Sequence, residues 1–211
     1  MKKGKLICFE GGEGSGKSTM VKNTYEYLKN KGIDCITFKE PGGTKVGEDI
    51  RNILLNKEYS SSLDEQTKLY LLEAGRRENY LHIIKPALEA GKVILADRFV
   101  LSSLVLQNKS LGTNVIDDLN NYATDCIDID ATIILDIDPE TAINRIVLNN
   151  RETNYNDVQP LEWHTNIRNL LIYLGMAMPK FKSHMVDANR NEDEVFKDVI
   201  NLIEEVINKD E

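Results

Sequence analysis

Hydrophobic residues in this chain form short runs that alternate with longer segments of helical spacing. Five runs have the length and the apolar content of buried strands: residues 5–9, 33–38, 92–97, 131–136 and 183–187. Between these runs, apolar side chains recur at the spacing of amphipathic helices. The predicted helices cover residues 18–31, 45–56, 64–90 (as one or two helices), 99–107, 139–149 and 161–178. A last helix contains Val195 and Val206. This alternation predicts an α/β fold, in which right-handed crossovers build a parallel sheet of about five strands with helices on both faces.

The length and the composition favour one globular domain. The chain has 211 residues, of which 41% are hydrophobic and 28% charged, so a sizeable core can form and we expect a single domain over residues 1–211. These values exclude collagen-like, disordered and low-complexity proteins.

The negative charge is unevenly distributed. The formal net charge is −8, and residues 191–211 hold eight acids against two lysines. In the predicted last helix the acids lie opposite the apolar stripe, so we interpret them as a solvated helix face. Acidity of this kind argues against a nucleic-acid partner.

The cysteines and the N-terminal segment indicate a reducing compartment. Cys8, Cys35 and Cys126 have no CxxC spacing and no nearby pair of histidines, which favours free thiols over a metal site. The apolar stretch after Lys5 is too short for a signal peptide and has no cleavage site. Because no window approaches the roughly 18 apolar residues of a membrane span, we expect a cytoplasmic protein with no membrane partner.

A glycine-rich segment after the first predicted strand matches the phosphate-binding pattern G-x-x-x-x-G-K-[ST]. It lies between an apolar strand and an amphipathic helix, as the pattern requires. Its glycines let backbone N–H groups approach phosphate oxygens, and the helix N-terminus adds a partial positive charge. We expect Lys17 to reach the β- and γ-phosphates and the Ser18 hydroxyl to bind Mg²⁺. The predicted nucleotide-binding residues are Gly11, Gly12, Glu13, Gly14, Ser15, Gly16, Lys17, Ser18 and Thr19.

A magnesium–nucleotide site also needs a carboxylate at the end of a neighbouring strand. Asp97 and Asp136 each end an apolar run, and ligands of parallel sheets bind at the carboxyl ends of strands. Either aspartate can therefore face the phosphates. Arg98 follows Asp97 directly, which pairs a metal- or proton-handling group with a phosphate clamp.

Further segments, in their order along the chain, resemble bacterial thymidylate kinases. Besides the phosphate-binding segment, the most specific are Glu40-Pro41-Gly42-Gly43-Thr44 and Asp97-Arg98-Phe99 followed by Gln107. The resemblance extends over about residues 5–170 and also includes residues 47–51, 72–77 and 135–139. It implies a three-layer αβα fold of the P-loop kinase type with a short lid.

The resemblance also implies a reaction, in which the γ-phosphoryl group of Mg²⁺-bound ATP passes to dTMP and yields dTDP for dTTP biosynthesis. Both substrates are polyanions, so catalysis depends on positioning and charge neutralisation. It implies that Ser18 and Asp97 bind the metal and that the catalytic residues are Lys17, Asp97, Arg98 and Arg151. The acceptor-binding residues implied by the family are Glu13, Lys39, Arg51, Leu72, Arg76, Arg98, Ser103 and Gln107.

Residues 149–160 fall where nucleoside monophosphate kinases carry a lid that closes over the phosphates. The phosphate-binding segment has no arginine among Glu13, Gly14 and Ser15, and family members of that type place the charge-stabilising arginine in the lid. Arg151 is the candidate, with Arg145 upstream. The resemblance further implies a homodimer.

The chain departs from the family pattern at the positions that the resemblance assigns to binding of the acceptor base. The family commonly has Phe-Ala-Ala-x-Arg where this chain has Leu72-Glu73-Ala74-Gly75-Arg76, and tyrosines where it has Phe99 and Leu106. Tyr155 stands in place of a second lid arginine, and Lys39 in place of an arginine before Glu40. Two other functions therefore stay open: a kinase of another deoxynucleoside monophosphate, and a nucleotide-binding switch protein that is not a kinase.

Overall fold

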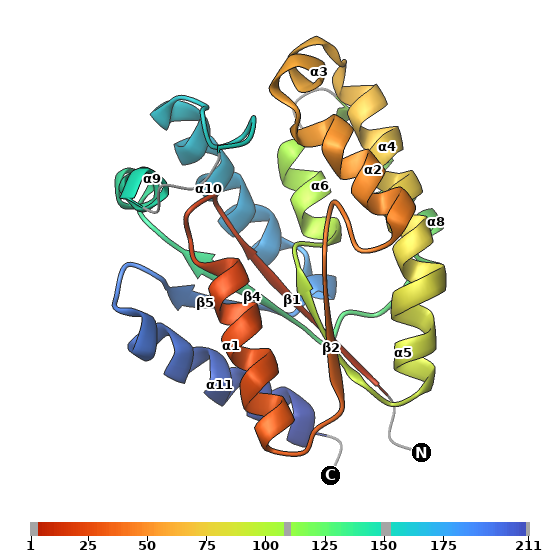
Figure 1. Ribbon diagram of the computed structural model, residues 1–211, viewed down its shortest axis with the longest axis vertical. Coiled ribbons are helices and arrows are strands. Elements are labelled where there is room, and N and C mark those ends of the chain that lie inside the picture. The colour runs from red at the N-terminus through yellow and green to blue at the C-terminus, as the bar shows by residue number, and fades with distance from the viewer. Residues whose placement is uncertain (1–3, 108–110, 149–152, 210–211) are drawn as a thin grey trace.

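The computed structural model describes residues 4–107, 111–148 and 153–209. At its centre is a sheet of five strands in the order β2-β3-β1-β4-β5, and all four pairings are parallel (Figure 1). The strands are β1 (Lys5–Gly11), β2 (Cys35–Lys39), β3 (Val93–Asp97), β4 (Ala131–Asp136) and β5 (Ser183–Asp187). All five predicted strands are confirmed.

The strands are apolar throughout because each face of the sheet packs against helices. On β1, Ile7 and Phe9 belong to one buried cluster, whereas Leu6 and Cys8 belong to the cluster on the other face. The first face is covered by α1 (Lys17–Asn30) and α11 (Glu192–Asn208), and the second by α5 (Lys85–Glu89), α6 (Val100–Leu106), α8 (Thr113–Ala123) and α10 (Leu161–Ala177). The layers confirm the predicted αβα class.

The remaining helices lie mostly beyond the carboxyl ends of the strands, in the upper part of Figure 1. They are α2 (Lys45–Leu55), α3 (Lys57–Ser62), α4 (Glu65–Asn79) and α9 (Pro139–Leu148), with a π-helical turn at Tyr80–Ile84 and a 3₁₀ turn at Pro179–Phe181. Residues 65–89 form one uninterrupted helical path through α4, the π turn and α5, which agrees with the prediction of one or two helices there.

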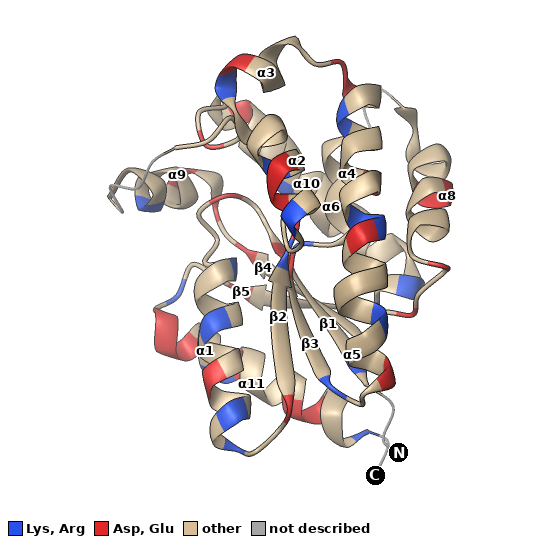
Figure 2. Ribbon diagram, turned by 45° about the vertical axis from the view of Figure 1, so that its right-hand side comes forward, with Lys and Arg blue, Asp and Glu red and all other residues tan. Residues whose placement is uncertain are grey.

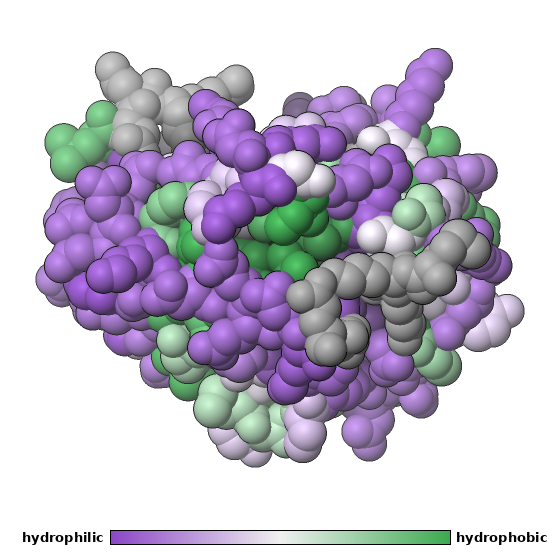
Figure 3. Space-filling model, turned by 90° about the horizontal axis from the view of Figure 1, so that it is seen from below, coloured by the Kyte–Doolittle hydropathy of each residue, from purple (hydrophilic) through white to green (hydrophobic). Residues whose placement is uncertain are grey.

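The surface agrees with the charge analysis. On α11, Val195, Val199 and Ile203 enter the core, and the acids of the first turn are exposed, as predicted for a solvated face. The three cysteines are free, with Cys8 and Cys35 buried. Seen from below the orientation of Figure 1, the surface is mostly hydrophilic and hydrophobic side chains gather in a central hollow (Figure 3). Within the described residues, no helix is both long enough and apolar enough to cross a membrane.

Candidate active site

A cavity of about 700 Å³ opens at the carboxyl ends of the strands. Segments with charges of both signs surround this edge of the sheet (Figure 2). The cavity is lined by residues 13–18 of the phosphate loop (residues 11–18), by the loop after β2, by the end of β3 and by the turn that precedes α11. Ligands of parallel sheets bind at this edge, so the cavity is the candidate active site.

The phosphate loop connects β1 to α1 and depends on its glycines. Gly14 has φ +74° and Gly16 has φ +90°, conformations that side-chain-bearing residues rarely adopt. A Cβ atom on Gly14 would lie only 2.4 Å from the backbone oxygen of Ala142 in α9. The loop therefore curves tightly at the N-terminus of α1, where its N–H groups can meet phosphate oxygens.

Lys17 lies at the centre of this loop. Its ammonium group donates hydrogen bonds to the backbone oxygens of Gly11 (3.0 Å) and Gly12 (2.7 Å), and its side chain is buried at the cavity wall. Burial, together with the positive charge of Arg98, lowers the pKa of Lys17 to about 8. A polyanion bound in the cavity would favour the charged form of this amine.

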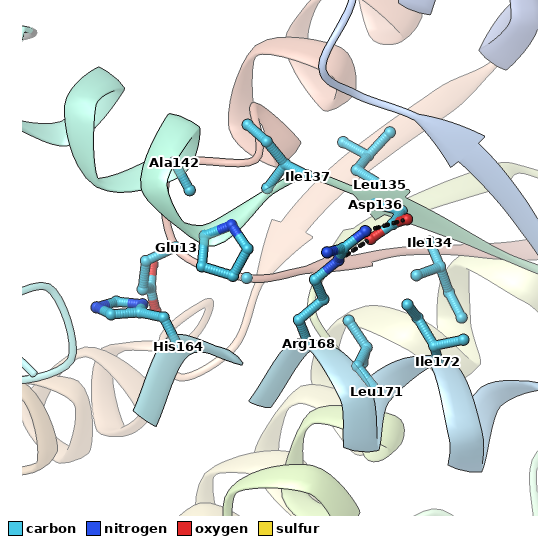
Figure 4. Close-up of a pocket in the computed structure, with 12 residues that line it drawn as sticks. Glu13, Ile134, Leu135, Asp136, Ile137, Ala142, His164, Arg168, Leu171 and Ile172 are labelled. Atoms are coloured by element: carbon cyan, nitrogen blue, oxygen red, sulfur yellow. Dashed lines mark hydrogen bonds and ion pairs between the residues drawn. The ribbon is translucent and has the colours of Figure 1, made fainter. Parts of the chain in front are cut away.

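The structure separates the two candidate aspartates. Ser18 donates a hydrogen bond of 2.5 Å to the carboxylate of Asp97, and both residues line the cavity. Asp136 instead accepts two hydrogen bonds, of 2.6 and 2.9 Å, from Arg168 beside a small pocket behind the phosphate loop (Figure 4). Of these two aspartates, Asp97 is therefore the one that faces the cavity.

Ser18 and Asp97 offer oxygen ligands of the kind that Mg²⁺ prefers. This ion usually takes one or two protein oxygens and completes its coordination with water and substrate phosphates. Among the described residues there is no cluster of three or more His, Cys, Asp or Glu side chains that could hold a metal. The pair fits a metal bound together with a nucleotide and does not fit a permanent structural metal.

Arg98 is held rigidly between β3 and the phosphate loop. Its backbone has φ +71°, and its guanidinium donates to Gly11 O (3.1 Å), Ser102 Oγ (3.2 Å) and Glu13 Oε1 (2.8 Å). Such an arginine presents a fixed cation to the cavity, as a phosphate clamp requires.

Glu10 supports this arrangement, and the sequence analysis assigned it no role. Its fully buried carboxylate accepts hydrogen bonds from the N–H groups of Phe99 and Ser102 and from the Ser102 hydroxyl, at 2.7–3.2 Å. Burial raises the pKa of Glu10, although the charge of Arg98 opposes this shift. The only signal in the sequence is an acid within an apolar strand, next to Gly11.

Lys39 and Arg51 also line the cavity. Arg51 donates a hydrogen bond of 2.7 Å to the backbone oxygen of Pro41, and Lys39 ends β2 in an exposed position. Together with Lys17 and Arg98, they place four basic side chains around one space.

The other residues implied to bind the acceptor lie deeper or further away. Arg76 is almost fully buried and is joined to Ser103 (2.9 Å) and to Glu40 (2.6 Å), and Glu40 in turn lines the cavity. Gln107 is buried and Leu72 is partly exposed. Leu72, Arg76, Ser103 and Gln107 are all absent from the cavity wall itself, as are Gly11 and Gly12.

The described part of the predicted lid, residues 153–160, forms turns that contact two sides of the molecule. Thr153 accepts a hydrogen bond from Lys57 of α3 (3.1 Å), and the ring of Tyr155 lies 5.2 Å from the ammonium of Lys68 in α4. Asn156 donates to Glu13 of the phosphate loop (3.4 Å). Arg151, predicted to be catalytic, lies outside the described residues.

Several residues that line the cavity had no predicted role, namely Ala188, Arg190, Asn191 and Glu192, and two others, Asn154 and Asn156, belong to the predicted lid. Arg145, named in the sequence analysis only as lying upstream of Arg151, lines it too. Most of these residues lie on loops without any recognisable pattern, so only the folded chain reveals them.

Comparison with known proteins assigns the family. The sequence profile described as thymidylate kinase matches residues 9–199. The chain belongs to the thymidylate kinase family. It is 38% identical to a thymidylate kinase of Clostridium novyi, over 94% of this chain and 98% of that protein. It is 39% identical to one from a Geobacillus species, over 92% and 93% of the two chains.

Its fold is also that of a thymidylate kinase family member. The crystal structure of thymidylate kinase from Ehrlichia chaffeensis superposes with a TM-score of 0.76 at 27% sequence identity, covering 95% of this chain and 99% of that one. The resemblance expected from the sequence motifs is therefore confirmed, as is the fold class.

Proposed function

We propose that this protein transfers the γ-phosphoryl group of ATP to dTMP and releases dTDP and ADP. An oxygen of the acceptor phosphate bonds to the γ-phosphorus while the bond from that phosphorus to the β–γ bridging oxygen breaks. The observation that carries the proposal is that Lys17, Lys39, Arg51 and Arg98 surround one cavity beside the phosphate loop. Two polyanions can approach each other there only because cations offset their repulsion.

The phosphate loop and Lys17 bind the donor in this proposal. The loop N–H groups hold the donor phosphates, and the charge of Lys17 offsets negative charge that builds up on the β- and γ-phosphate oxygens. Ser18 and Asp97 would hold Mg²⁺, which would act as a Lewis acid on the donor phosphates.

The acceptor phosphate binds on the other side of the γ-phosphate. Arg98 and Arg51 hold it, with Lys39 at the rim, and Glu13 lies near the sugar. Arg98 suits this role because Gly11, Ser102 and Glu13 already fix its guanidinium, so little side-chain entropy is lost on binding. The acceptor base is recognised behind Glu40 by Arg76, Ser103, Gln107 and Leu72. The proposed lid brings Arg151 to the phosphates.

The test of this function is a panel of monophosphate acceptors. With ATP and Mg²⁺, dTMP is expected to give the highest kcat/KM among dTMP, dUMP, dCMP, dGMP and dAMP. A higher value for another acceptor would instead support the divergent kinase that Leu72 and Leu106 suggest. ATP hydrolysis without phosphorylation of any acceptor would support the switch protein.

The assembly and the location are also proposals. We infer that residues 1–211 form one domain with a lid at residues 149–160, that it acts in the cytoplasm and that it forms a homodimer. Exposed apolar side chains on α2, α3 and α4 (Val46, Ile53, Tyr59 and Tyr70) support association. A light-scattering mass of one chain, 23.9 kDa, would rule the dimer out.

A further inference from the structure

The guanidinium of Arg76 is enclosed by acceptors from four different segments. Its Nε and Nη2 donate to Oε2 of Glu40, at 2.9 and 2.6 Å. Its Nη1 lies 2.6 Å from Oε1 of Glu73, 2.9 Å from the Ser103 hydroxyl and 2.5 Å from Oδ1 of Asn120. The side chain is 1% exposed, and its guanidinium carbon lies 5.6 Å from the centre of the Phe99 ring.

Few of the N–H donors of Arg76 remain available to a ligand. A guanidinium has five N–H groups, one on Nε and two on each terminal nitrogen. Glu40 takes the Nε–H and one N–H of Nη2, and both N–H groups of Nη1 are surrounded by the three other acceptors. One N–H, on Nη2, remains. Arg76 therefore offers a bound base a single donor in a fixed direction.

Glu73 is the member of this cluster that the family motif does not explain, since the family commonly has alanine there. It lies one turn before Arg76 on α4, and its side chain is 10% exposed. Its Oε1 accepts from Arg76, whereas its Oε2 is buried without a hydrogen-bond partner in the part of the chain that the structure describes. A buried carboxylate with an unpaired oxygen is costly to keep, which suggests that it has a role.

We propose that Glu73 is a positioning residue for recognition of the acceptor base. Glu73 is the charged acceptor on Nη1, so together with Glu40 it fixes the orientation of the guanidinium and of the one N–H that Glu40 leaves free on Nη2. That N–H suits a carbonyl oxygen on the base edge and disfavours an amino group at that place. The inference rests on the proposed function, because it takes Arg76 to be a base-reading residue. It adds that this chain controls the orientation of Arg76 with a carboxylate of its own.

The test compares Glu73→Ala and Glu73→Gln in the full-length protein. Glu73→Ala leaves Nη1 with only the uncharged acceptors Ser103 and Asn120, so the guanidinium is held less firmly. KM for dTMP is therefore expected to rise about tenfold and the preference for dTMP over dCMP to fall by a similar factor, with kcat changed less than about threefold. Glu73→Gln keeps an acceptor oxygen at the same place but not the charge, and is expected to restore part of the affinity at pH 7.5.

A pH profile supplies a readout that a purely structural role would not change. Burial and the negative charge of Glu40 raise the pKa of Glu73, and the charge of Arg76 opposes them. The facing residues of α6 and α8, Ser103 and Asn120, carry no charge. As pH falls, Glu73 is therefore protonated earlier than an ordinary glutamate, and the wild-type KM for dTMP is expected to rise more steeply than that of Glu73→Gln. Glu40 and the phosphate of dTMP are the same in both proteins, so the difference reports Glu73.

Glu78→Ala is the matched control, because Glu78 lies on the same helix and pairs with His82 (3.6 Å), away from Arg76. Thermal unfolding of every variant reports folding separately. Unchanged KM and unchanged dTMP preference in folded Glu73→Ala would overturn the proposal. If that variant does not fold, pH profiles of wild type and Glu73→Gln that coincide would overturn it, and profiles that diverge support it. A wild type inactive on dTMP would instead refute the proposed function.

Discussion

Replacing Lys17 with alanine is expected to lower kcat about 10³-fold, with dTMP or with any other acceptor. The ammonium group of Lys17 lies within 3.0 Å of two phosphate-loop carbonyls and at the wall of the cavity, where it meets the charge that develops on the donor phosphates. No other cationic side chain belongs to the phosphate loop itself. The measurement is steady-state ADP release with saturating ATP, Mg²⁺ and dTMP.

Lys22→Ala is the control for this prediction. Lys22 is on the same helix, exposed, and 4.0 Å from Glu26, so its loss should leave kcat unchanged. A fall of less than about tenfold in folded Lys17→Ala would contradict the assigned role.

The pH dependence of ATP binding separates the charge of Lys17 from its shape. The pKa of Lys17 is lowered to about 8, so in the free protein the amine loses its charge as pH rises through that value. Wild-type affinity for ATP is therefore expected to fall above pH 8, by calorimetry. Lys17→Arg, whose guanidinium stays charged, should bind ATP with a flatter profile.

The sheet was predictable because its strands are buried on both faces. A continuous apolar run such as residues 131–136 has only one stable placement, inside a covered sheet. Two helices escaped prediction for the opposite reason. The six residues of α3 bury only Ser60, and the helix is begun by the Asn56 side chain. The sequence of α8 is rich in Asn and Asp, which have low helix propensity, and packing of Ile116 into the core stabilises it.

The candidate site was predictable where its chemistry is contiguous in the chain. The phosphate loop needs local glycines and a following helix, and both appear in residues 11–30. Contacts between distant residues were not predictable. The strand pattern alone gave Asp97 and Asp136 equal standing, and the contact that occupies Asp136 comes from Arg168, 32 residues away. The partners of Arg76 likewise come from residues 36 and 44 positions away in sequence, Glu40 and Asn120.

Replacing Arg98 with alanine is expected to raise KM for the acceptor about a hundredfold and to lower kcat, while ATP binding is affected much less. Its guanidinium reaches the cavity between Gly11 and Glu13, and its loss leaves the partly buried carboxylate of Glu13 without this ion pair. Local repulsion between that carboxylate and the acceptor phosphate adds to the lost attraction. The control is Arg77→Ala, which removes a partly exposed arginine that bonds to Asp125 (2.7 Å).

The same variant separates the kinase from the switch protein. A kinase needs Arg98 for its acceptor, so titration with dTMP should show weaker binding in folded Arg98→Ala, whereas titration with ATP should resemble that of the wild type. A switch protein has no acceptor, and its slow hydrolysis of ATP would survive the substitution.

If acceptor KM stays within about threefold of wild type, the phosphate clamp must be another residue of the cavity wall, and Arg51 is the first to test. The predicted result follows from the geometry, because Arg98 is bonded to the phosphate loop from the end of β3 and is held in place by Ser102, the partner of buried Glu10.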